Sequence, residues 1–208
     1  MWLAFYNASV GDVLMLVQNE IPAEDRQVEH LDQLTLIKDK TNGEIVAVNL
    51  FSVEDLKIEQ NGPVQLTPAQ VAEVNQRLKE AQVDLTIEVD SSSKFVVGYV
   101  ETCRPHEDSD HLSITEIDLG QESSVQIVCG ADNIRQGLKV LVAKIGAVMP
   151  SGSIIWPGQL RGVDSNGMVC STRELNLTDI EDFPGIWELS DHFEPGTPLE
   201  DFVAYYRD

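Results

Sequence analysis

The chain has 208 residues, 42% of them hydrophobic, and a mean hydropathy of −0.12, the composition of an ordinary globular protein. No apolar run reaches the roughly 18 residues that a membrane-spanning helix needs, and the N-terminus lacks the basic flank of a signal peptide. Cys103, Cys129 and Cys170 form no even set and no C-x-x-C spacing. We therefore expect buried thiols, a cytoplasmic location and no structural zinc.

The formal net charge of −21 is distributed unevenly. Residues 1–93 carry 6 basic and 16 acidic side chains, residues 94–173 carry 7 and 9, and residues 174–208 carry 1 and 10. The middle segment is therefore close to neutral between two acidic segments. Together with a change of pattern near residue 90, this predicts two small domains, residues 1–90 and 94–204. Acidic flanks oppose binding to nucleic acid, whose phosphates are held mainly by Lys and Arg.

The first 53 residues read as antiparallel strands. Residues 2–6 and 12–18 are apolar runs separated by a turn, and residues 33–39 and 44–53 flank the pair Asn42-Gly43. An Asn-Gly pair supplies the positive backbone angles of a tight hairpin turn. We therefore expect two hairpins in this part of the chain.

One helix is predicted in the first domain. Thr67 can cap it, Pro68 suits its first turn, and Gln70 stands three residues after the cap. Val71, Val74, Leu78 and Ala81 fall on one face, so the helix should run for about 13 residues. Residues 84–89 alternate as a further strand, and residues 90–93 form a linker. The first domain is thus expected to be a small α+β unit.

Beyond residue 94 the pattern is that of short strands. Nine glycines fall between residues 94 and 173, and strand-like runs cover residues 95–102, 112–119, 125–129, 140–145 and 168–171. Five short strands with turns between them suit a small closed barrel. Ser171 and Glu174 are spaced as a capping box, which predicts a short helix leading into residues 175–177. The last 30 residues contain too many large apolar side chains for a disordered tail, so we expect a C-terminal extension that wraps the barrel.

Four sequence blocks carry a resemblance to a known domain. They are H-E-D-S-D-H-L at residues 106–112, I-V-C-G-A-D-N-I-R-Q-G-L-K-V at 127–140, G-A-V-M-P-S-G at 146–152 and L-R-G-V-D-S-N-G-M-V-C-S at 160–171. In this order they resemble the tRNA-binding domain of the bacterial phenylalanyl-tRNA synthetase beta chain, the methionyl-tRNA synthetase C-terminal domain and stand-alone tRNA-binding proteins. With about 90 residues in front and no synthetase catalytic domain, the chain looks like the YtpR family of tRNA-binding proteins.

This resemblance implies an all-β OB-fold, a five-stranded barrel that follows the α+β N-terminal domain, and RNA binding without enzymatic activity. The sequence agrees in lacking the phosphate-binding motif G-x-x-x-x-G-K-[ST] and the nucleophile motif G-x-S-x-G. No cofactor is expected, and tRNA or another structured RNA is the expected partner.

The predicted RNA contacts in the first two blocks are His106, His111, Asn133 and Arg135, with Lys144 just after them. His111 stands where relatives carry lysine, so a phosphate contact there is expected to depend on protonation. Asn133 can also bond across its own loop, and Arg135 and Lys144 have the alternative role of solvated surface charges. The cluster His106, Asp108, Asp110 and His111 offers imidazole and carboxylate groups to a metal ion, but its spacing matches no known ligand set, so no metal is expected.

The predicted contacts in the last part of the motif are Trp156, Arg161, Ser165, Asn166 and Met168. Arg161 can contact phosphate with two donors, and the Ser165 and Asn166 side chains offer hydrogen-bond donors. The alternative for Ser165 and Met168 is a turn residue and a core residue. Trp156 stands where relatives are rich in lysine, and it could stack on a base or anchor a protein contact. The alternative function is accordingly a protein-interaction or homodimerisation module that uses the OB-fold as a scaffold.

Overall fold

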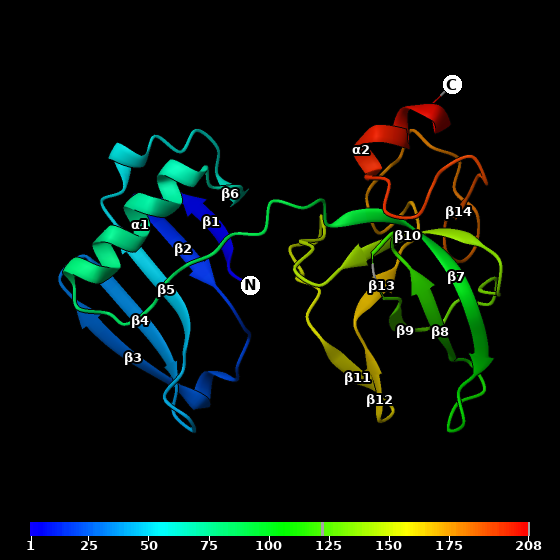
Figure 1. Ribbon diagram of the computed structural model, residues 1–208, viewed down its shortest axis with the longest axis horizontal. Helices are drawn as coiled ribbons and strands as arrows, with labels where there is room; N and C mark the ends of the chain where they lie inside the picture. Colours follow the sequence, from blue (N-terminus) through cyan, green and yellow to red (C-terminus); the bar gives the residue numbers. More distant parts are fainter. Residues whose placement is uncertain (122, 208) are drawn as a thin grey trace. The chain divides into compact units, whose positions relative to one another are not determined.

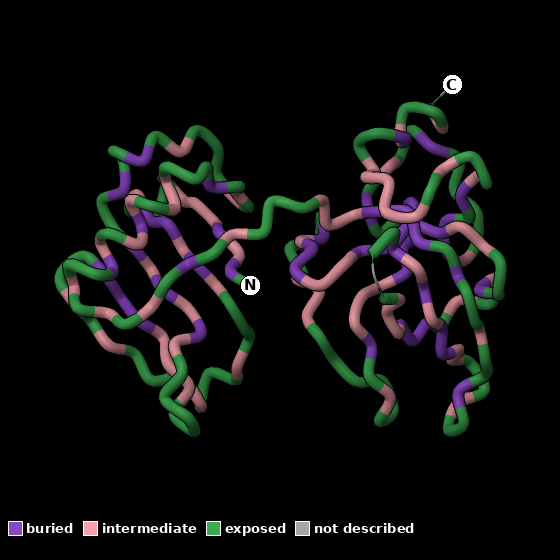
Figure 2. Tube along the Cα trace, in the orientation of Figure 1, coloured by how far each residue is buried: buried purple, intermediate pink, exposed green. Residues whose placement is uncertain are grey.

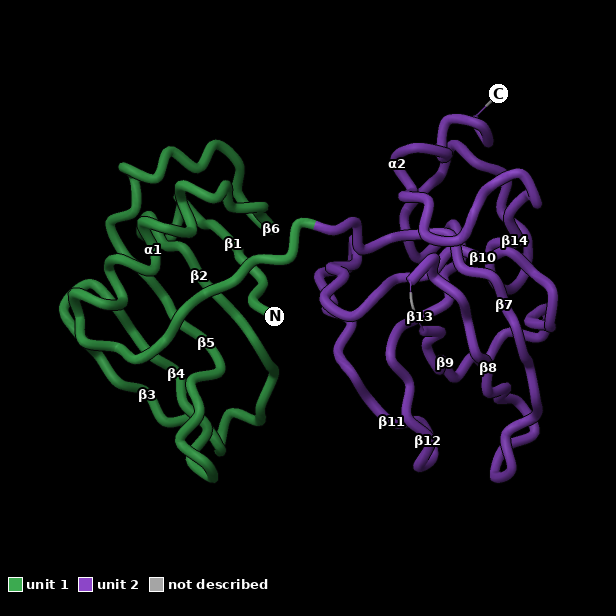
Figure 3. The backbone as a smooth tube through the Cα atoms, in the orientation of Figure 1, with its two compact units in different colours: residues 1–91 green, residues 92–208 purple. Residues whose placement is uncertain are grey.

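The computed structural model describes residues 1–121 and 123–207. The chain divides into two compact units, residues 1–91 and 92–208 (Figure 3), and each unit is described by itself. None of the helices in the described residues has the length and apolar character needed to span a membrane.

The first unit is built on one antiparallel sheet of six strands (Figure 1). The strand order is β3-β4-β5-β2-β1-β6, and every neighbouring pair is antiparallel. The strands are β1 (Leu3–Asn7), β2 (Val13–Val17), β3 (Arg26–Leu31), β4 (Leu34–Asp39), β5 (Ile45–Phe51) and β6 (Gly62–Val64). Short 3-10 turns occur at Ala23–Asp25 and Glu54–Leu56.

The hairpin predicted around residue 42 forms between β4 and β5, but its turn differs from the prediction. Only Gly43 has a positive φ, +78°, and its N–H donates to the Asp39 carbonyl at 2.8 Å. The Asn42 side chain instead accepts a hydrogen bond from Glu44 N–H at 2.9 Å. The loop is therefore longer than a two-residue turn, because Asn42 stabilises it with its side chain and not with a left-handed backbone.

The predicted helix forms as α1 (Pro68–Glu80), with both hydrogen bonds of the capping box between Thr67 and Gln70. Val74 and Leu78 are fully buried in the core of this unit. The strand predicted at residues 84–89 does not form. Asn75 on α1 replaces a neighbouring strand there: its Oδ1 accepts from Ile87 N–H at 2.7 Å and its Nδ2 donates to the Ile87 carbonyl at 3.0 Å.

The second unit contains a five-stranded antiparallel path in the order β13-β10-β7-β8-β9 (Figure 1). These strands are β7 (Phe95–Pro105), β8 (Ser113–Asp118), β9 (Val125–Cys129), β10 (Lys139–Lys144) and β13 (Gly167–Val169). A separate hairpin joins β11 (Gly158–Leu160) to β12 (Val163–Ser165), and β14 (Glu188–Leu189) pairs with β10. All five strands expected from the sequence are present.

The two ends of this path approach each other. Asn166, just before β13, donates its backbone N–H to the Gln126 carbonyl of β9 at 2.9 Å. The enclosed core includes Val100, Ile117 and Ile127, none of them exposed. A Cβ at Gly98 would lie 2.6 Å from Ile117 and 2.7 Å from the Val142 side chain, so only glycine allows this packing.

The C-terminal extension packs as a second core against the outside of β7 and β10. Trp187 lies 4.9 Å from the Tyr206 ring, and Phe193 lies 4.9 Å from the Phe202 ring. α2 (Leu199–Phe202) and a 3-10 turn at Val203–Tyr206 supply part of this aromatic cluster.

The helix predicted at residues 171–177 is wrong. The capping hydrogen bonds do form, since Glu174 Oε2 accepts from Ser171 N–H at 2.7 Å. However, Asn176 takes a left-handed backbone with φ of +54°, and Leu177 N–H donates to the Thr172 carbonyl at 3.0 Å. The chain therefore closes after one turn, as at the end of a helix.

Candidate nucleic-acid interface

The tip of the β11–β12 hairpin lies against the loop between β7 and β8. Leu160 faces Val163 across the hairpin, and Arg161 and Gly162 form the turn with φ of +47° and +80°. The imidazole Nε2 of His106 lies 3.3 Å from the Leu160 carbonyl, and Arg161 Nη1 donates to the Asp108 carbonyl at 3.2 Å. Two motifs more than 50 residues apart in the sequence therefore form one surface.

His106 holds this contact in place from inside. Its side chain is 4% exposed, and its Nδ1 accepts a hydrogen bond from Asp108 N–H at 3.0 Å. The ring proton must then be on Nε2, which donates to Leu160. Both ring nitrogens are thus engaged within the protein, and the side chain that was predicted to touch RNA is not presented to solvent. His111, at the other end of the same loop, is exposed.

Ser165 and Asn166 are adjacent in the sequence, but they differ in burial and in hydrogen bonding. Ser165 is buried, and its Oγ accepts a hydrogen bond from Val128 N–H of β9 at 3.1 Å, so it links β12 to β9. Asn166 is half-buried, and its side-chain amide makes no hydrogen bond within the part of the chain that the structure describes. Ser165 is therefore a buried strand residue at the end of β12 and not the turn residue of the alternative prediction, whereas the Asn166 amide remains available for a ligand.

Met168 lies on β13 and Lys144 on β10, and these two strands pair with each other. Met168 is half-buried and packs against the second core, as expected for the alternative core role. Lys144 ends β10 opposite Gly167, and its Nζ lies 3.3 Å from Ser92 Oγ. Lys144 is therefore close in the strand register to the Ser165–Gly167 turn.

In the described residues, Asn133 and Arg135 make no hydrogen bond to the β11–β12 tip, and instead they contact residues 186–188 at and before β14. Asn133 Nδ2 donates to the Ile186 carbonyl at 3.0 Å, and its Oδ1 accepts from Ile186 N–H at 2.9 Å. Arg135 contacts both Glu188 carboxylate oxygens, at 3.0 and 2.9 Å. The hydrogen bonds from Arg135 lower the pKa of the Glu188 carboxyl, so the pair stays ionised. The charge of Arg135 is thus neutralised locally.

Trp156 is half-buried, which differs from the exposed stacking platform considered from the sequence. Its indole N–H is enclosed without a hydrogen-bond partner among the described residues. Burial of an unpaired N–H is unfavourable. The structure thus offers Trp156 for stacking over only part of its ring.

The arginines of the second unit differ in whether they form an ion pair with a carboxylate. Arg135, Arg173 and Arg207 each pair with a carboxylate, at 2.9, 2.7 and 2.7 Å. Arg161 is exposed and contacts a carbonyl oxygen, and the exposed Arg104 near the end of β7 has no ion-pair partner in the described residues. Arg104 is not among the RNA contacts predicted from the sequence, although its position two residues before the His106 motif could have indicated it.

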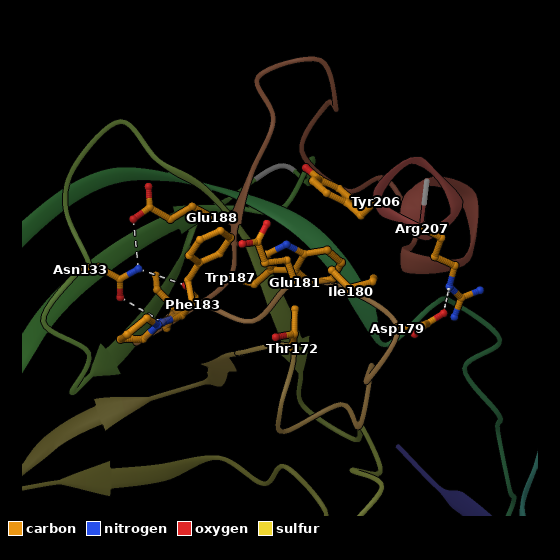
Figure 4. Close-up of a pocket in the computed structure, with 12 residues that line it drawn as sticks. Asn133, Thr172, Asp179, Ile180, Glu181, Phe183, Trp187, Glu188, Tyr206 and Arg207 are labelled. Carbon is orange, nitrogen blue, oxygen red and sulfur yellow. Dashed lines mark hydrogen bonds and ion pairs between the residues drawn. The ribbon is translucent and has the colours of Figure 1, made fainter.

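A pocket of about 760 Å³ lies in the C-terminal extension of the second unit (Figure 4). Figure 4 shows the Asn133–Glu188 contact on one side of it and the Asp179–Arg207 ion pair on the other. Glu181, between them, adds a further carboxylate to the lining. The pocket is therefore acidic and separate from the Arg161 surface.

The two buried cysteines, Cys129 and Cys170, are packing residues and not reactive thiols. Burial raises the pKa of the Cys170 thiol to about 12 and also raises the pKa of Cys129. Because the thiolate is the reactive form, neither side chain is set up as a nucleophile. Within residues 1–121 and 123–207, no group of three or more His, Cys, Asp or Glu side chains is arranged to hold a metal ion.

Comparison with known proteins supplies the family. A family model described as "Putative tRNA binding domain" matches residues 95–198, and one described as a domain of unknown function matches residues 22–90. The chain is 51% identical over 109 residues to the phenylalanine–tRNA ligase beta subunit of Sulfurimonas denitrificans, covering 50% of this chain but only 14% of that subunit. A solved structure of a MetRS related protein from Pyrococcus horikoshii matches with a TM-score of 0.38 and 20% identity, over 50% of this chain and 87% of that one.

One relative extends over both units. The "Putative tRNA-binding protein YtpR" of Bacillus subtilis is 44% identical over 200 residues, which is 95% of this chain and 98% of that protein. The match therefore includes the N-terminal sheet as well as the domain that carries the four sequence blocks. The chain belongs to the YtpR family of tRNA-binding proteins.

Proposed function

We propose that residues 94–204 bind tRNA as an OB-type five-stranded barrel and that the chain does so without catalysing a reaction. The α+β unit of residues 1–90 precedes this barrel. Family membership and the four sequence blocks support the proposal. The observation that carries it is the setting of Arg161, an exposed arginine that is fixed by a carbonyl contact and has no carboxylate partner among the described residues. A tRNA ligand implies a cytoplasmic site of action.

The proposed contact surface is centred on the β11–β12 tip. Arg161 binds phosphate with the guanidinium donors that the Asp108 carbonyl leaves unused. Arg104 and His111 flank it across the β7–β8 loop, and the Asn166 amide reads a base or a sugar hydroxyl. His106 and Ser165 act as positioning residues, because both are buried and hold the two motifs together.

Four other predicted contacts are expected to contribute less to this surface. Lys144 extends it along β10, next to the Ser165–Gly167 turn. Asn133 and Arg135 serve the packing of residues 186–188, and Met168 serves the second core. These four positions are therefore expected to change tRNA affinity less than Arg161 does.

The acidic side chains of the β7–β8 loop limit the affinity. Glu107, Asp108 and Asp110 are exposed in the loop whose Asp108 carbonyl contacts Arg161, and their carboxylates repel phosphate. Arg104 and Arg161 are the arginines of this surface that have no ion-pair partner among the described residues, so we expect about two phosphate contacts and a correspondingly modest salt dependence. Recognition then depends on hydrogen bonds and shape more than on overall charge.

A matched pair of arginine variants tests this proposal. Arg161→Gln removes the charge at the hairpin tip, whereas Arg173→Gln removes one that is paired with Asp182 at 2.7 Å in the C-terminal extension. Fluorescence anisotropy with labelled tRNA at about 50 mM salt should show a loss of about tenfold or more for Arg161→Gln, since a hydrogen bond to a charged group contributes about 1.5–3 kcal/mol. The control should bind within about twofold of wild type. Equal affinities for both variants, with intact circular dichroism spectra, contradict the proposed surface.

A further inference from the structure

Three hydrogen-bond donors of the loop between β9 and β10 converge on one carboxylate of the C-terminal extension. Glu188 Oε1 accepts from Asn133 Nδ2 and from Arg135 Nη1, both at 3.0 Å, and Glu188 Oε2 accepts from Arg135 Nη2 at 2.9 Å. Paired guanidinium N–H donors bind the oxygens of carboxylate and of phosphate with the same geometry. The Arg135 side chain is therefore arranged to bind an anion that offers two oxygens, and Glu188 occupies that position.

Arg135 lies beside Arg104, one of the arginines of the proposed tRNA surface. The Cys103 thiol on β7 contacts the Ile134 carbonyl oxygen at 3.9 Å, and both of these side chains pack into the same core. The residues that follow them, Arg104 and Arg135, are both exposed. β7 is mostly buried in its first half and mostly exposed in its second half, where Arg104 lies (Figure 2). Two arginine side chains thus reach solvent from adjacent stretches of backbone.

The loop that carries Arg135 also begins beside the β7–β8 loop. A Cβ at Gly130 would lie 3.3 Å from Leu112 Cδ2 and 3.9 Å from the His111 carbonyl oxygen. The same β7–β8 loop contacts the β11–β12 tip through the hydrogen bond from Arg161. Arg135 therefore belongs to a segment that adjoins the proposed tRNA surface on two sides, at β7 and at the β7–β8 loop.

We infer that Arg135 is a further phosphate-binding residue of this surface and that Glu188 competes with the RNA phosphate for it. The inference rests on the proposed function, because it concerns the same RNA. A carboxylate and a phosphate cannot both accept from the same two guanidinium donors. The C-terminal segment of residues 174–208, which has 10 acidic side chains and 1 basic one, thereby lowers the affinity of the surface for RNA.

Only the Glu188 side chain has to move for Arg135 to bind phosphate. The neighbouring residues Ile186, Trp187 and Leu189 are buried, and the backbone of β14 pairs with β10, so the extension stays in place. The Glu188 and Arg135 side chains are 38% and 60% exposed. An ion pair with this exposure is weak. A phosphate can therefore displace the carboxylate, and the competition lowers RNA affinity without preventing binding.

Glu188→Gln in the full chain tests the inference. The substitution keeps the length of the side chain and one acceptor oxygen, but it removes the charge that competes with phosphate. One additional phosphate contact makes the slope of log affinity against log salt steeper by about 0.9. Labelled tRNA should therefore bind about three- to tenfold more tightly than to wild type at about 50 mM salt, with a smaller difference at about 200 mM.

Glu181→Gln is the matched control. Glu181 is exposed in the same extension, lines the same pocket as Glu188, and has no ion-pair partner in the part of the chain that the structure describes. The control changes the net charge by the same one unit, so it should bind tRNA within about twofold of wild type. The double variant Arg135→Gln, Glu188→Gln should lose the gain in affinity, because the guanidinium that Glu188 releases is then absent.

The inference is overturned if Glu188→Gln, with a wild-type circular dichroism spectrum, binds tRNA no more tightly than Glu181→Gln. It is also overturned if the double variant keeps the gain, because the gain then comes from overall charge and not from Arg135. In both cases the proposed function stands if Arg161→Gln still weakens binding. If neither wild type nor Glu188→Gln binds tRNA at about 50 mM salt, the proposed function and the inference fail together.

Discussion

Asn133 offers a direct way to distinguish a structural role from an RNA contact. Its side chain satisfies both backbone groups of Ile186, a residue that is only 5% exposed, through bonds of 2.9 and 3.0 Å. The Gly185 backbone passes so close that a Cβ there would lie 2.0 Å from Asn133 Oδ1. Asn133→Ala therefore leaves a buried N–H and a buried carbonyl without partners.

Each unsatisfied buried group costs about 1–3 kcal/mol. Because Asn133 is half-exposed, water can enter part of the vacated space, so we expect a combined loss of about 2 kcal/mol. With a urea dependence of about 1.5 kcal/mol per molar, the unfolding midpoint should fall by more than about 1 M. Urea unfolding followed by tryptophan fluorescence in a Trp2→Phe background measures this, since the remaining tryptophans, Trp156 and Trp187, belong to the second unit.

Gln136→Ala, at an exposed position three residues away, serves as the control and should change stability by less than about 0.5 kcal/mol. The reasoning is refuted if Asn133→Ala unfolds at the same urea concentration as Gln136→Ala but loses tRNA affinity. Asn133 is then an RNA ligand and not a packing residue.

Three further outcomes follow from the same structure. Ser165→Ala should lower the free energy of unfolding by about 1–3 kcal/mol in thermal or urea unfolding, because it leaves the Val128 N–H of β9 unpaired. Ser153→Ala changes an exposed serine and should have no effect on stability. Equal unfolding midpoints for the two variants argue against the Ser165 contact. Thiol labelling of the folded protein at pH 8 should leave Cys170, whose pKa is about 12, unmodified until denaturant is added, and modification in the folded state contradicts its burial. Glu188→Gln should lose about 0.2–1 kcal/mol at neutral pH. Because Arg135 lowers the pKa of Glu188, this contribution is complete above the ordinary glutamate pKa and disappears as pH falls through the lowered value; a difference from wild type that grows in acid contradicts the ion pair.

The parts of the fold that the sequence predicts correctly are those with local signals. Thr67, Pro68 and Gln70 mark the start of α1, and the structure contains the capping box that they imply. Strand β3 was not predicted, because Arg26–Leu31 is mostly polar and pairs only as an edge strand. The opposite error at residues 84–89 has its cause in Asn75, whose side chain supplies the hydrogen bonds that a neighbouring strand normally gives.

For the candidate site, the sequence places Arg161 in a turn but gives no information on burial or ion pairing. His106 and Ser165 have the same motif context as Arg161, yet both are buried by contacts with Leu160 and Val128. Arg135 is neutralised by Glu188, which is 53 residues away in the sequence. Such long-range contacts form only when the strands of the second unit and the C-terminal extension have come together. They are not visible in a local pattern.

The salt dependence of tRNA binding by the wild-type protein tests the central claim most directly. Two phosphate contacts correspond to a slope of about −1.8 in a plot of log affinity against log salt, or roughly a tenfold loss of affinity between about 50 and 200 mM. Equilibrium binding to labelled tRNA across this range should give that slope for wild type and a slope shallower by about one for Arg161→Gln. No detectable binding at about 50 mM, or an affinity that does not change with salt, contradicts the account.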